Sequence, residues 1–234
     1  MRFNWNPIKG CFVRRINRFV GLAEVEGEVC KVHIHDPGRL EELLVPGAEI
    51  LVRAHEGESR RTKYYLFAVK YCGSWILLDS AVHNRIAREA IEHGMIGELN
   101  GYRVLKAEHY YMGCRVDFLL ESPLGIKALM EVKGCSLAVN GVALFPDAPT
   151  IRGRRHVERL IRALNEGYES IILFLVLRSD AAVFKPNWSI DPNFSAILVR
   201  ACEVGVKVLA YKVLFRVNGE VEARISSSIP VVLH

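Results

Sequence analysis

The first third of the chain alternates short apolar runs with Gly, Pro and charged residues, a pattern typical of short antiparallel strands. Six strands are predicted, at residues 12–13, 18–25, 29–34, 48–54, 64–70 and 74–78. So many short strands in so short a segment favour a small closed barrel, and a five-stranded oligonucleotide-binding (OB) type barrel is the natural candidate. We therefore expect an OB-type β-barrel over residues 1–78.

After Asp79 the pattern changes to helices mixed with longer strands. Helical periodicity predicts helices at 80–94, 154–166 and 191–205, and apolar runs predict strands at 102–111, 116–120, 127–137, 170–177 and 206–213. The run at 170–177 is apolar after its first residue, as expected at the centre of a sheet that helices cover. Residues 79–234 are therefore predicted to form an α/β domain with a mixed sheet.

Charged residues interrupt the hairpin that residues 116–137 predict. Asp117 lies in its first strand, a turn follows at 121–125, and Glu131 and Lys133 lie in its second strand. Side chains alternate between the faces of a strand, so Glu131 and Lys133 share one face, and antiparallel pairing can bring Asp117 beside them. Two carboxylates and one ammonium group are expected to converge on the sheet.

This convergence points to metal-dependent phosphodiester hydrolysis. Clustered carboxylates repel each other unless a cation lies between them, and Mg²⁺ (or Mn²⁺) takes one or two carboxylates and leaves positions for water and phosphate oxygens. Asp117 and Glu131 are the predicted ligands, and Lys133 would orient or deprotonate the attacking water or neutralise phosphate charge. Glu89 and Glu108 are candidates for a further carboxylate ligand.

Two plainer interpretations stay open. Glu-x-Lys is commonplace, and on a solvated sheet face it is an ion pair of little energetic value. The three charged residues could also form an ion-paired cluster with a purely structural role. The apolar residues on both sides of Glu131 argue for a sheet covered on both faces, where a buried charge needs a partner or a metal ion.

Basic residues gather in three places and suggest contacts with nucleic acid. The clusters are Arg14, Arg15 and Arg18; Arg60, Arg61 and Lys63; and Arg152, Arg154, Arg155 and His156. Tyr64 and Tyr65 follow the second cluster, and interleaved aromatic and basic side chains suit base stacking and phosphate contact. The third cluster lies at the start of a helix, where cations are unfavourable unless an anion such as phosphate joins them. Solvated faces, or pairing of the third cluster with Asp147 or Glu158, are the alternatives.

Composition narrows the setting. A net charge of +5 permits a polyanionic partner. The longest apolar run, 171–177, is too short to span a bilayer, and the N-terminus lacks the pattern of a signal peptide, so a cytoplasmic protein with no membrane partner is expected. The six cysteines form no Cys-x-x-Cys pair, which argues against a zinc site or thiol redox motif. Most are expected to be buried thiols; disulfides and a homodimer stay open.

The second part of the chain resembles the PD-(D/E)xK, or restriction-endonuclease-like, superfamily. The resemblance rests on the order helix, three strands, helix, strand, and on the spacing of Asp117, Glu131 and Lys133, with thirteen residues between the two acids. Val116 stands where the superfamily often has proline.

The whole chain is similar to the sugar fermentation stimulation protein A family. The motifs that carry this likeness are Asp36-Pro-Gly-Arg-Leu, Lys63-Tyr64, Asn84-Arg85, Arg115-Val-Asp117-Phe, Glu131-Val-Lys133, Phe145-Pro-Asp147-Ala, Arg152-Gly153, His156 and Ile190-Asp191-Pro192. The resemblance implies an OB-type barrel followed by a nuclease-like domain, and DNA, single- or double-stranded, as the partner. It leaves two functions open: a divalent-metal-dependent nuclease, or a non-catalytic DNA-binding regulator of sugar metabolism genes that retains the nuclease-like fold.

Overall fold

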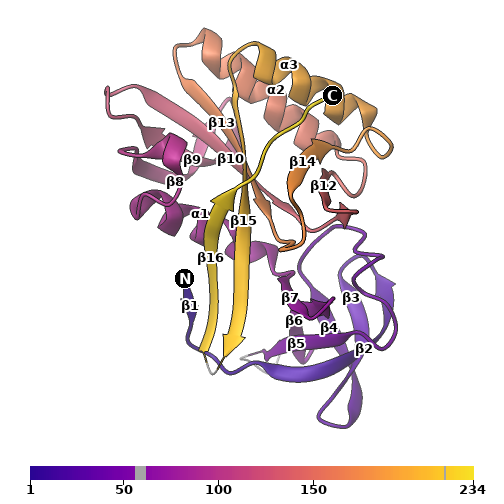
Figure 1. Cartoon of the computed structure of the whole chain (residues 1–234). Coiled ribbons are helices and arrows are strands. Elements are labelled where there is room, and N and C mark those ends of the chain that lie inside the picture. The colour runs from indigo at the N-terminus through magenta and orange to yellow at the C-terminus, as the bar shows by residue number, and fades with distance from the viewer. Residues whose placement is uncertain (56–61, 219) are drawn as a thin grey trace. The chain divides into compact units, whose positions relative to one another are not determined.

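The computed structural model describes residues 1–55, 62–218 and 220–234 (Figure 1). The chain divides into two compact units. The first comprises Met1–Val82 with Leu214–Ala223, and the second comprises His83–Val213 with Arg224–His234. None of the helices in the described ranges combines the length and the apolar character needed to cross a membrane.

The first unit contains a closed β-barrel of five strands. These are β2 (Ile8–Asn17), β3 (Val20–Val25), β4 (Glu28–Ile34), β5 (Glu49–Ala54) and β6 (Tyr64–Tyr71). They lie in the order β4-β3-β2-β5-β6, and parallel pairing of β4 with β6 closes the barrel, while β7 (Ser74–Leu77) extends the sheet beyond β6. Each strand contributes a buried apolar side chain to the core: Phe12, Ala23, Val32, Ile50 and Leu66. The predicted OB-type barrel is confirmed.

A short N-terminal strand was not apparent in the sequence. β1 (Arg2–Phe3) pairs antiparallel with part of β16 (Glu220–Ser228), so that Phe3 lies opposite Val221. The Phe3 ring packs against Phe67, with 4.9 Å between ring centroids, and against Phe215 at 6.5 Å. A strand of two residues has no periodicity to detect, and its pairing partner comes from the far end of the chain.

The second unit is built on a mixed sheet. Its strands are β8 (Arg103–Tyr111), β9 (Cys114–Glu121), β10 (Lys127–Cys135), β13 (Glu169–Val176) and the parts of β15 (Lys207–Asn218) and β16 outside Leu214–Ala223, in the order β16-β15-β13-β10-β9-β8. β13 runs parallel to β10 and β15, and β9 runs antiparallel to β8 and β10. The predicted α/β domain with a mixed sheet is confirmed, with the apolar strand β13 at its centre.

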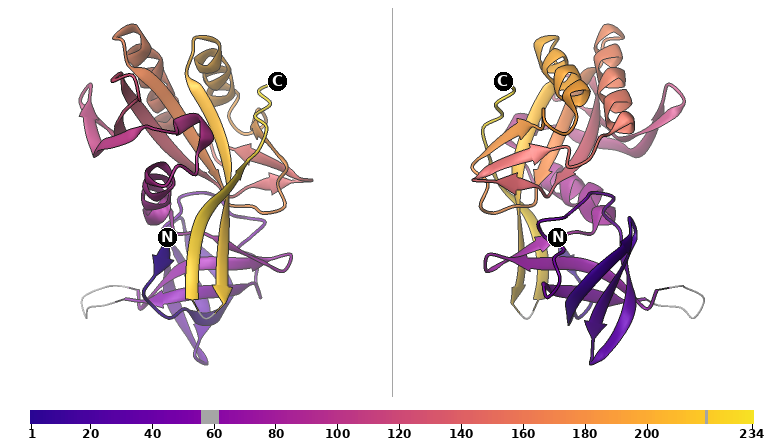
Figure 2. Two further views of the ribbon diagram at one scale, coloured as in Figure 1. Left: turned by 60° about the vertical axis from the view of Figure 1, so that its left-hand side comes forward. Right: turned by 90° about the vertical axis from the view of Figure 1, so that its right-hand side faces the viewer.

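Three α-helices flank this sheet: α1 (His83–Glu92), α2 (Ile151–Asn165) and α3 (Pro192–Glu203). α2 and α3 lie side by side on one face of the sheet (Figure 2). Both begin at side-chain caps, because Thr150 Oγ1 accepts from the Gly153 N–H at 3.0 Å and Asp191 Oδ1 accepts from the Phe194 N–H at 2.9 Å. The caps explain why α2 begins before the predicted residue 154. Short 3₁₀ turns, η1 (Ser80–Val82) and η2 (Gly97–Leu99), precede and follow α1.

Two sequence-based expectations for this unit were incomplete or wrong. A small sheet of β11 (Ala138–Val139), β12 (Val142–Phe145) and β14 (Val183–Pro186) was not predicted, because its strands have two to four residues and are interrupted by Pro, Asn and Gly. The six cysteines are all free thiols, but Cys135 alone among them is buried, so the expectation of mostly buried thiols was wrong.

Candidate active site

Asp117 is fixed where strands β9 and β10 separate. The antiparallel pairing of these strands ends at Met130 and Phe118, and the next partners in that register would be Glu131 and Asp117. Here the Asp117 side chain takes over the role of the backbone: its Oδ2 accepts from the Val132 N–H at 2.7 Å. Its Oδ1 accepts from Asn84 Nδ2 at 2.9 Å. The carboxylate is therefore oriented by β10 on one side and by the start of α1 on the other.

Glu131 is almost completely buried, with 2% of its side chain exposed. Its Oε2 lies 2.7 Å from Lys133 Nζ, as the strand alternation predicted, and 2.6 Å from His156 Nδ1 in α2. Arg152 Nε donates to His156 Nε2 at 3.3 Å. Because guanidinium nitrogens only donate, Nε2 is the acceptor of the ring and Nδ1 carries the proton that is donated to Glu131. Arg152, His156 and Glu131 thus form a directed chain of hydrogen bonds.

The two carboxyl groups have pKa values shifted in opposite directions. Burial raises the pKa of Asp117, and the Glu131 charge adds to this, against the lowering effects of Lys133, the Val132 N–H and Asn84. Burial alone would also raise the pKa of Glu131, but the Lys133 charge and the His156 hydrogen bond outweigh it and lower that pKa to about 2. Glu131 therefore stays ionised, and Asp117 is the carboxylate whose negative charge a nearby cation would stabilise.

Glu89 and Glu108, the candidates for a further ligand, are not grouped with this pair. Glu108 in β8 is exposed, and its Oε2 accepts from Arg115 Nη1 at 3.0 Å. Glu89 is half-buried in α1. Over the ranges that the structure describes, no three His, Cys, Asp or Glu side chains are clustered in a way that would hold a metal ion. The acidic donors that the structure brings together are thus Asp117 and Glu131.

The basic residues at the start of α2 have separate surroundings. Arg154 Nε lies 3.9 Å from Asp191 Oδ2, so the α3 cap is an acidic neighbour in addition to the partners considered from the sequence, Asp147 and Glu158. Asp191 Oδ2 also accepts from the Thr150 N–H at 2.8 Å. Arg152 and Arg155 are exposed. The cluster is therefore divided: Arg152 and His156 belong to the hydrogen-bond chain that reaches Glu131, Arg154 lies beside the α3 cap, and Arg155 faces solvent.

In the first unit, two of the predicted DNA contacts support a loop. Arg15 Nη1 donates to the Gly38 carbonyl at 2.8 Å and also to the Arg39 carbonyl, and Arg18 Nε donates to the Pro37 carbonyl at 2.9 Å. These guanidinium groups satisfy backbone acceptors that the loop leaves unpaired.

The remaining candidates of this unit differ in exposure. Arg14 and Lys63 are exposed, whereas Arg60 and Arg61 lie outside the described residues. Tyr64 is buried and donates through its hydroxyl to Glu26 at 2.8 Å, so it does not face solvent as the sequence suggested. Tyr65, on the opposite face of β6, is partly exposed.

Sequence patterns did not predict a role in the site for three residues: Asn84, His83 and Gly134. Asn84 was noted only as part of a motif, and its bond to Asp117 joins positions that no periodicity connects. His83 is buried and packs against Gly134. A Cβ atom added to residue 134 would lie only 2.2 Å from His83 Cε1. The signal that could have found Gly134 is its position next to Lys133 in an apolar strand, since glycine inside a strand often marks the close approach of another group.

The chain matches two family models that follow the same order as its two units. Residues 13–78 match the "SfsA N-terminal OB domain", and residues 81–219 match the "Sugar fermentation stimulation protein RE domain". These matches agree with an OB barrel followed by a nuclease-like domain.

Individual proteins give the same result. The chain is 50% identical over 209 residues to a sugar fermentation stimulation protein homolog from Caldivirga maquilingensis, covering 89% of each protein. It is 52% identical over 203 residues to the homolog from Pyrobaculum arsenaticum, covering 87% of this chain and 86% of that one. The solved structure of Pyrococcus furiosus SfsA in complex with Ca²⁺ superposes with a TM-score of 0.90 and 28% identity, over 99% of this chain and 98% of that chain. The chain belongs to the sugar fermentation stimulation protein family.

Proposed function

We propose that the second unit carries a divalent-metal-dependent nuclease site that hydrolyses phosphodiester bonds in DNA. The observation that carries the proposal is the convergence of Asp117, Glu131 and Lys133 on one part of the sheet, with Lys133 Nζ 2.7 Å from Glu131. Burying such charges in a sheet is costly, and apolar residues of similar size would serve stability as well or better. A catalytic role explains why charged residues occupy these three positions, although apolar residues would serve stability as well or better.

Mg²⁺ or Mn²⁺ fits the donor chemistry of this place. Asp117 and Glu131 offer hard oxygen donors, and the raised pKa of Asp117 is what a neighbouring cation would counteract. The Pyrococcus furiosus relative, described in complex with Ca²⁺, supports a site for a hard divalent ion. Asp117 and Glu131 would hold the ion, which when bound would supply Lewis acidity and a bound water of lowered pKa.

The protein's own residues have distinct roles in this proposal. Lys133 is the catalytic cation, placed to orient the attacking water or to neutralise charge that develops on the phosphate. His156 fixes the orientation of Glu131 through its Nδ1–H, and Arg152 fixes the tautomer of His156. Asn84 positions Asp117 through its amide. Glu89 and Glu108 have no role in it.

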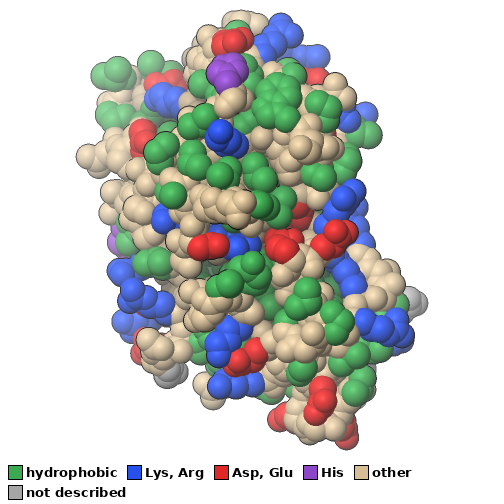
Figure 3. Space-filling model, turned by 45° about the vertical axis from the view of Figure 1, so that its right-hand side comes forward, with side chains coloured by type: hydrophobic (Ala, Val, Ile, Leu, Met, Phe, Trp, Pro, Cys, Tyr) green, Lys and Arg blue, Asp and Glu red, His purple; other side chains and the backbone are tan. Residues whose placement is uncertain are grey.

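DNA contacts are assigned to the basic side chains that face solvent. Arg152, which donates to His156, and Arg155 are exposed on α2, and Arg14 and Lys63 are exposed on the barrel unit. Basic and acidic side chains are interspersed on the face that Figure 3 displays, so this face offers separate contacts rather than one continuous basic stripe. Because DNA is the proposed substrate, we place the protein in the cytoplasm. Cysteines there generally stay reduced, in agreement with its six free cysteines.

Cleavage assays test the proposal. Wild-type protein is incubated with single- and double-stranded DNA in Mg²⁺ or Mn²⁺, beside the variants Asp117→Asn and Lys133→Met, with chelated samples as blanks. Product is expected, only with metal, from the wild type and from the control Glu158→Gln, an exposed change in α2, whereas Asp117→Asn and Lys133→Met should give none. Product from Asp117→Asn, or none from the wild type, would overturn the proposal. DNA binding without any product would favour the non-catalytic regulator instead.

A further inference from the structure

The outer surface of the barrel unit carries a line of side chains across three neighbouring strands. Arg53 in β5 lies directly opposite Tyr65 in β6, and Tyr65 lies directly opposite His33 in β4. All three are partly exposed. Directly opposite residues project from the same face of a sheet, so the three side chains follow one another over the barrel surface.

Ring geometry extends this line at both ends. The Arg53 guanidinium carbon lies 5.0 Å from the Tyr65 ring centroid and 5.9 Å from the ring of Trp5. On the other side, the ring centroids of Tyr65 and His33 are 5.5 Å apart, and those of His33 and His35 are 5.6 Å apart. We call these five residues, Trp5, Arg53, Tyr65, His33 and His35, the stacking row.

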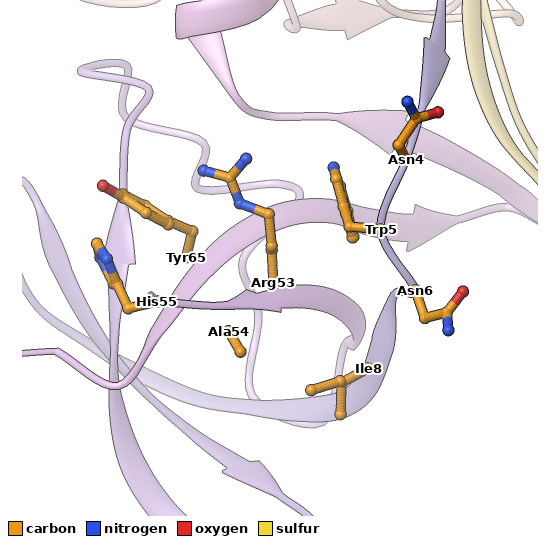
Figure 4. Close-up of a pocket in the computed structure, with 8 residues that line it drawn as sticks. All are labelled: Asn4, Trp5, Asn6, Ile8, Arg53, Ala54, His55 and Tyr65. Atoms are coloured by element: carbon orange, nitrogen blue, oxygen red, sulfur yellow. The ribbon is translucent and has the colours of Figure 1, made fainter. Parts of the chain in front are cut away.

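A pocket of about 410 Å³ opens at the Trp5 end of the row (Figure 4). Arg53 lies between Trp5 and Tyr65, and the His55 ring packs against Tyr65 in a tilted arrangement, with 3.7 Å between centroids and 36° between planes. The lining residues are Asn4, Trp5, Asn6, Ile8, Arg53, Ala54, His55 and Tyr65.

Three polar groups around this pocket have hydrogen-bonding atoms with no partner among the described residues. The side-chain amides of Asn4 and Asn6 are exposed and make no hydrogen bond within the described parts of the chain. The indole N–H of Trp5 is buried and has no acceptor among the described residues. Each carboxamide offers donors and an acceptor together, which is the complement of the edge of a nucleobase.

The chemistry of the row selects a class of ligand. Flat aromatic rings and a guanidinium plane present stacking surfaces that suit any base, and Arg53 supplies a positive charge for the phosphate backbone. Base faces are available for such stacking only where the strand is unpaired, since in a duplex they are covered by neighbouring base pairs. The ligand that fits is therefore a short unpaired stretch of nucleic acid.

We propose that the stacking row binds an unpaired segment of a DNA strand, with one base in the pocket against Trp5 and Arg53 and the amides of Asn4 and Asn6 at its edge. This inference rests on the proposed function only in taking DNA as the ligand. It adds a strandedness preference and a base-recognition site in the barrel unit, separate from the chemistry assigned to the second unit.

Binding to abasic DNA tests this assignment. Affinity is measured by fluorescence anisotropy in chelator, so that no cleavage occurs, for a single strand of about twelve nucleotides and for a deoxyribose-phosphate strand of equal length without bases. Both strands have the same charge, and only the first can stack. Wild-type protein is expected to bind the strand with bases about tenfold more tightly, as base stacking on an aromatic side chain allows.

The variants Arg53→Met, Tyr65→Leu and Asn4→Ala should bind the strand with bases more weakly and lose most of this preference. Arg2→Met is the matched control, because Arg2 is an exposed arginine of the same unit paired with Glu220 at 3.2 Å; it should retain the full preference. Thermal unfolding checks that each variant is folded, and Asn4→Ala changes an exposed side chain only.

Equal affinity of the wild type for both strands, or an unchanged preference in Arg53→Met, Tyr65→Leu and Asn4→Ala alike, would overturn the assignment. The result is independent of cleavage. A wild type that discriminates but never cleaves keeps the stacking row and removes the nuclease, whereas one that cleaves without discriminating does the reverse.

Discussion

Asn84 Nδ2 donates a hydrogen bond of 2.9 Å to Oδ1 of Asp117, and this bond connects the first turn of α1 to the candidate metal ligand on β9. The other carboxylate oxygen is already engaged by the Val132 N–H. Asp117 is therefore held in one orientation, and within the described parts of the chain it forms no ion pair, although burial raises its pKa. In sites that bind a metal ion, neutral hydrogen-bond donors typically orient a carboxylate and leave its negative charge to interact with the ion.

Replacing Asn84 should impair the site without dismantling the fold. Asn84→Ala removes one of the two donors to Asp117, and because that bond lowers the pKa of Asp117, its loss should raise this pKa further. We expect cleavage and metal affinity to fall by roughly 10- to 100-fold and the acidic limb of the pH–rate profile to move to higher pH. Arg88→Ala, which removes a surface pair with Glu92 on the same helix, is the control and should change neither. An unshifted pH profile in Asn84→Ala would contradict a positioning role.

Local patterns in the sequence predicted most of the fold. Each strand of the barrel was found because apolar residues alternate and turns are marked by Gly, Pro or charge, and α2 was found from its apolar stripe. β1, β11, β12 and β14 were missed because strands this short hold too few residues for a period, whereas β16 was missed although its buried residues Val221, Ala223 and Ile225 alternate with polar ones. β1 and β14 pair with segments distant in the chain, such as Val221 opposite Phe3, which no local pattern encodes.

Within the candidate site, only contacts that follow from the alternation of side chains along one strand could be predicted from the sequence. Glu131 and Lys133 are two residues apart, so their contact followed from the strand itself. Asn84 and His156 reach the carboxylates from helices packed on the sheet, and their roles depend on tertiary packing. The stacking row shows the same limit, because Trp5 and Tyr65 come together only once the barrel closes.

Lys133 should stabilise the fold in a pH-dependent way. The pKa of Glu131, about 2 against an ordinary 4.5, is depressed in the folded protein chiefly by the charge of Lys133 against the effect of burial. A depressed carboxyl pKa contributes stability that is complete above pH 4.5 and is lost as pH falls towards 2. In metal-free protein, Lys133→Met should therefore lower the free energy of unfolding by roughly 2 kcal/mol at pH 7 and by progressively less below pH 4.5.

Urea unfolding at pH 7, 5 and 3 in the presence of chelator measures this effect. Lys127→Met is the matched control, because Lys127 is an exposed lysine on the same strand, and it should change stability by less than about 0.5 kcal/mol at every pH. A deficit in Lys133→Met that stays constant from pH 7 to pH 3 would show that Lys133 contributes by packing rather than by its charge.

Gly134 should be required because His83 lies directly over it. A Cβ atom at residue 134 would be 2.2 Å from His83 Cε1 and 2.7 Å from His83 Nδ1, so the buried ring would have to move. His83 precedes Asn84 in α1 and Gly134 follows Lys133 in β10, so this movement would disturb both sides of the site. We expect Gly134→Ala to lower the free energy of unfolding by about 1–3 kcal/mol and to reduce cleavage.

A double-mutant cycle separates this steric effect from any general loss of flexibility. In the His83→Ala background the ring is absent, so adding Gly134→Ala should cost much less than it does in the wild type. Gly97→Ala is the control, because its Cβ would meet Tyr211 Oη at an ordinary 3.9 Å, and it should cost less than about 1 kcal/mol. If Gly134→Ala is equally destabilising with and without His83, the close approach of the two residues is not what requires glycine in β10.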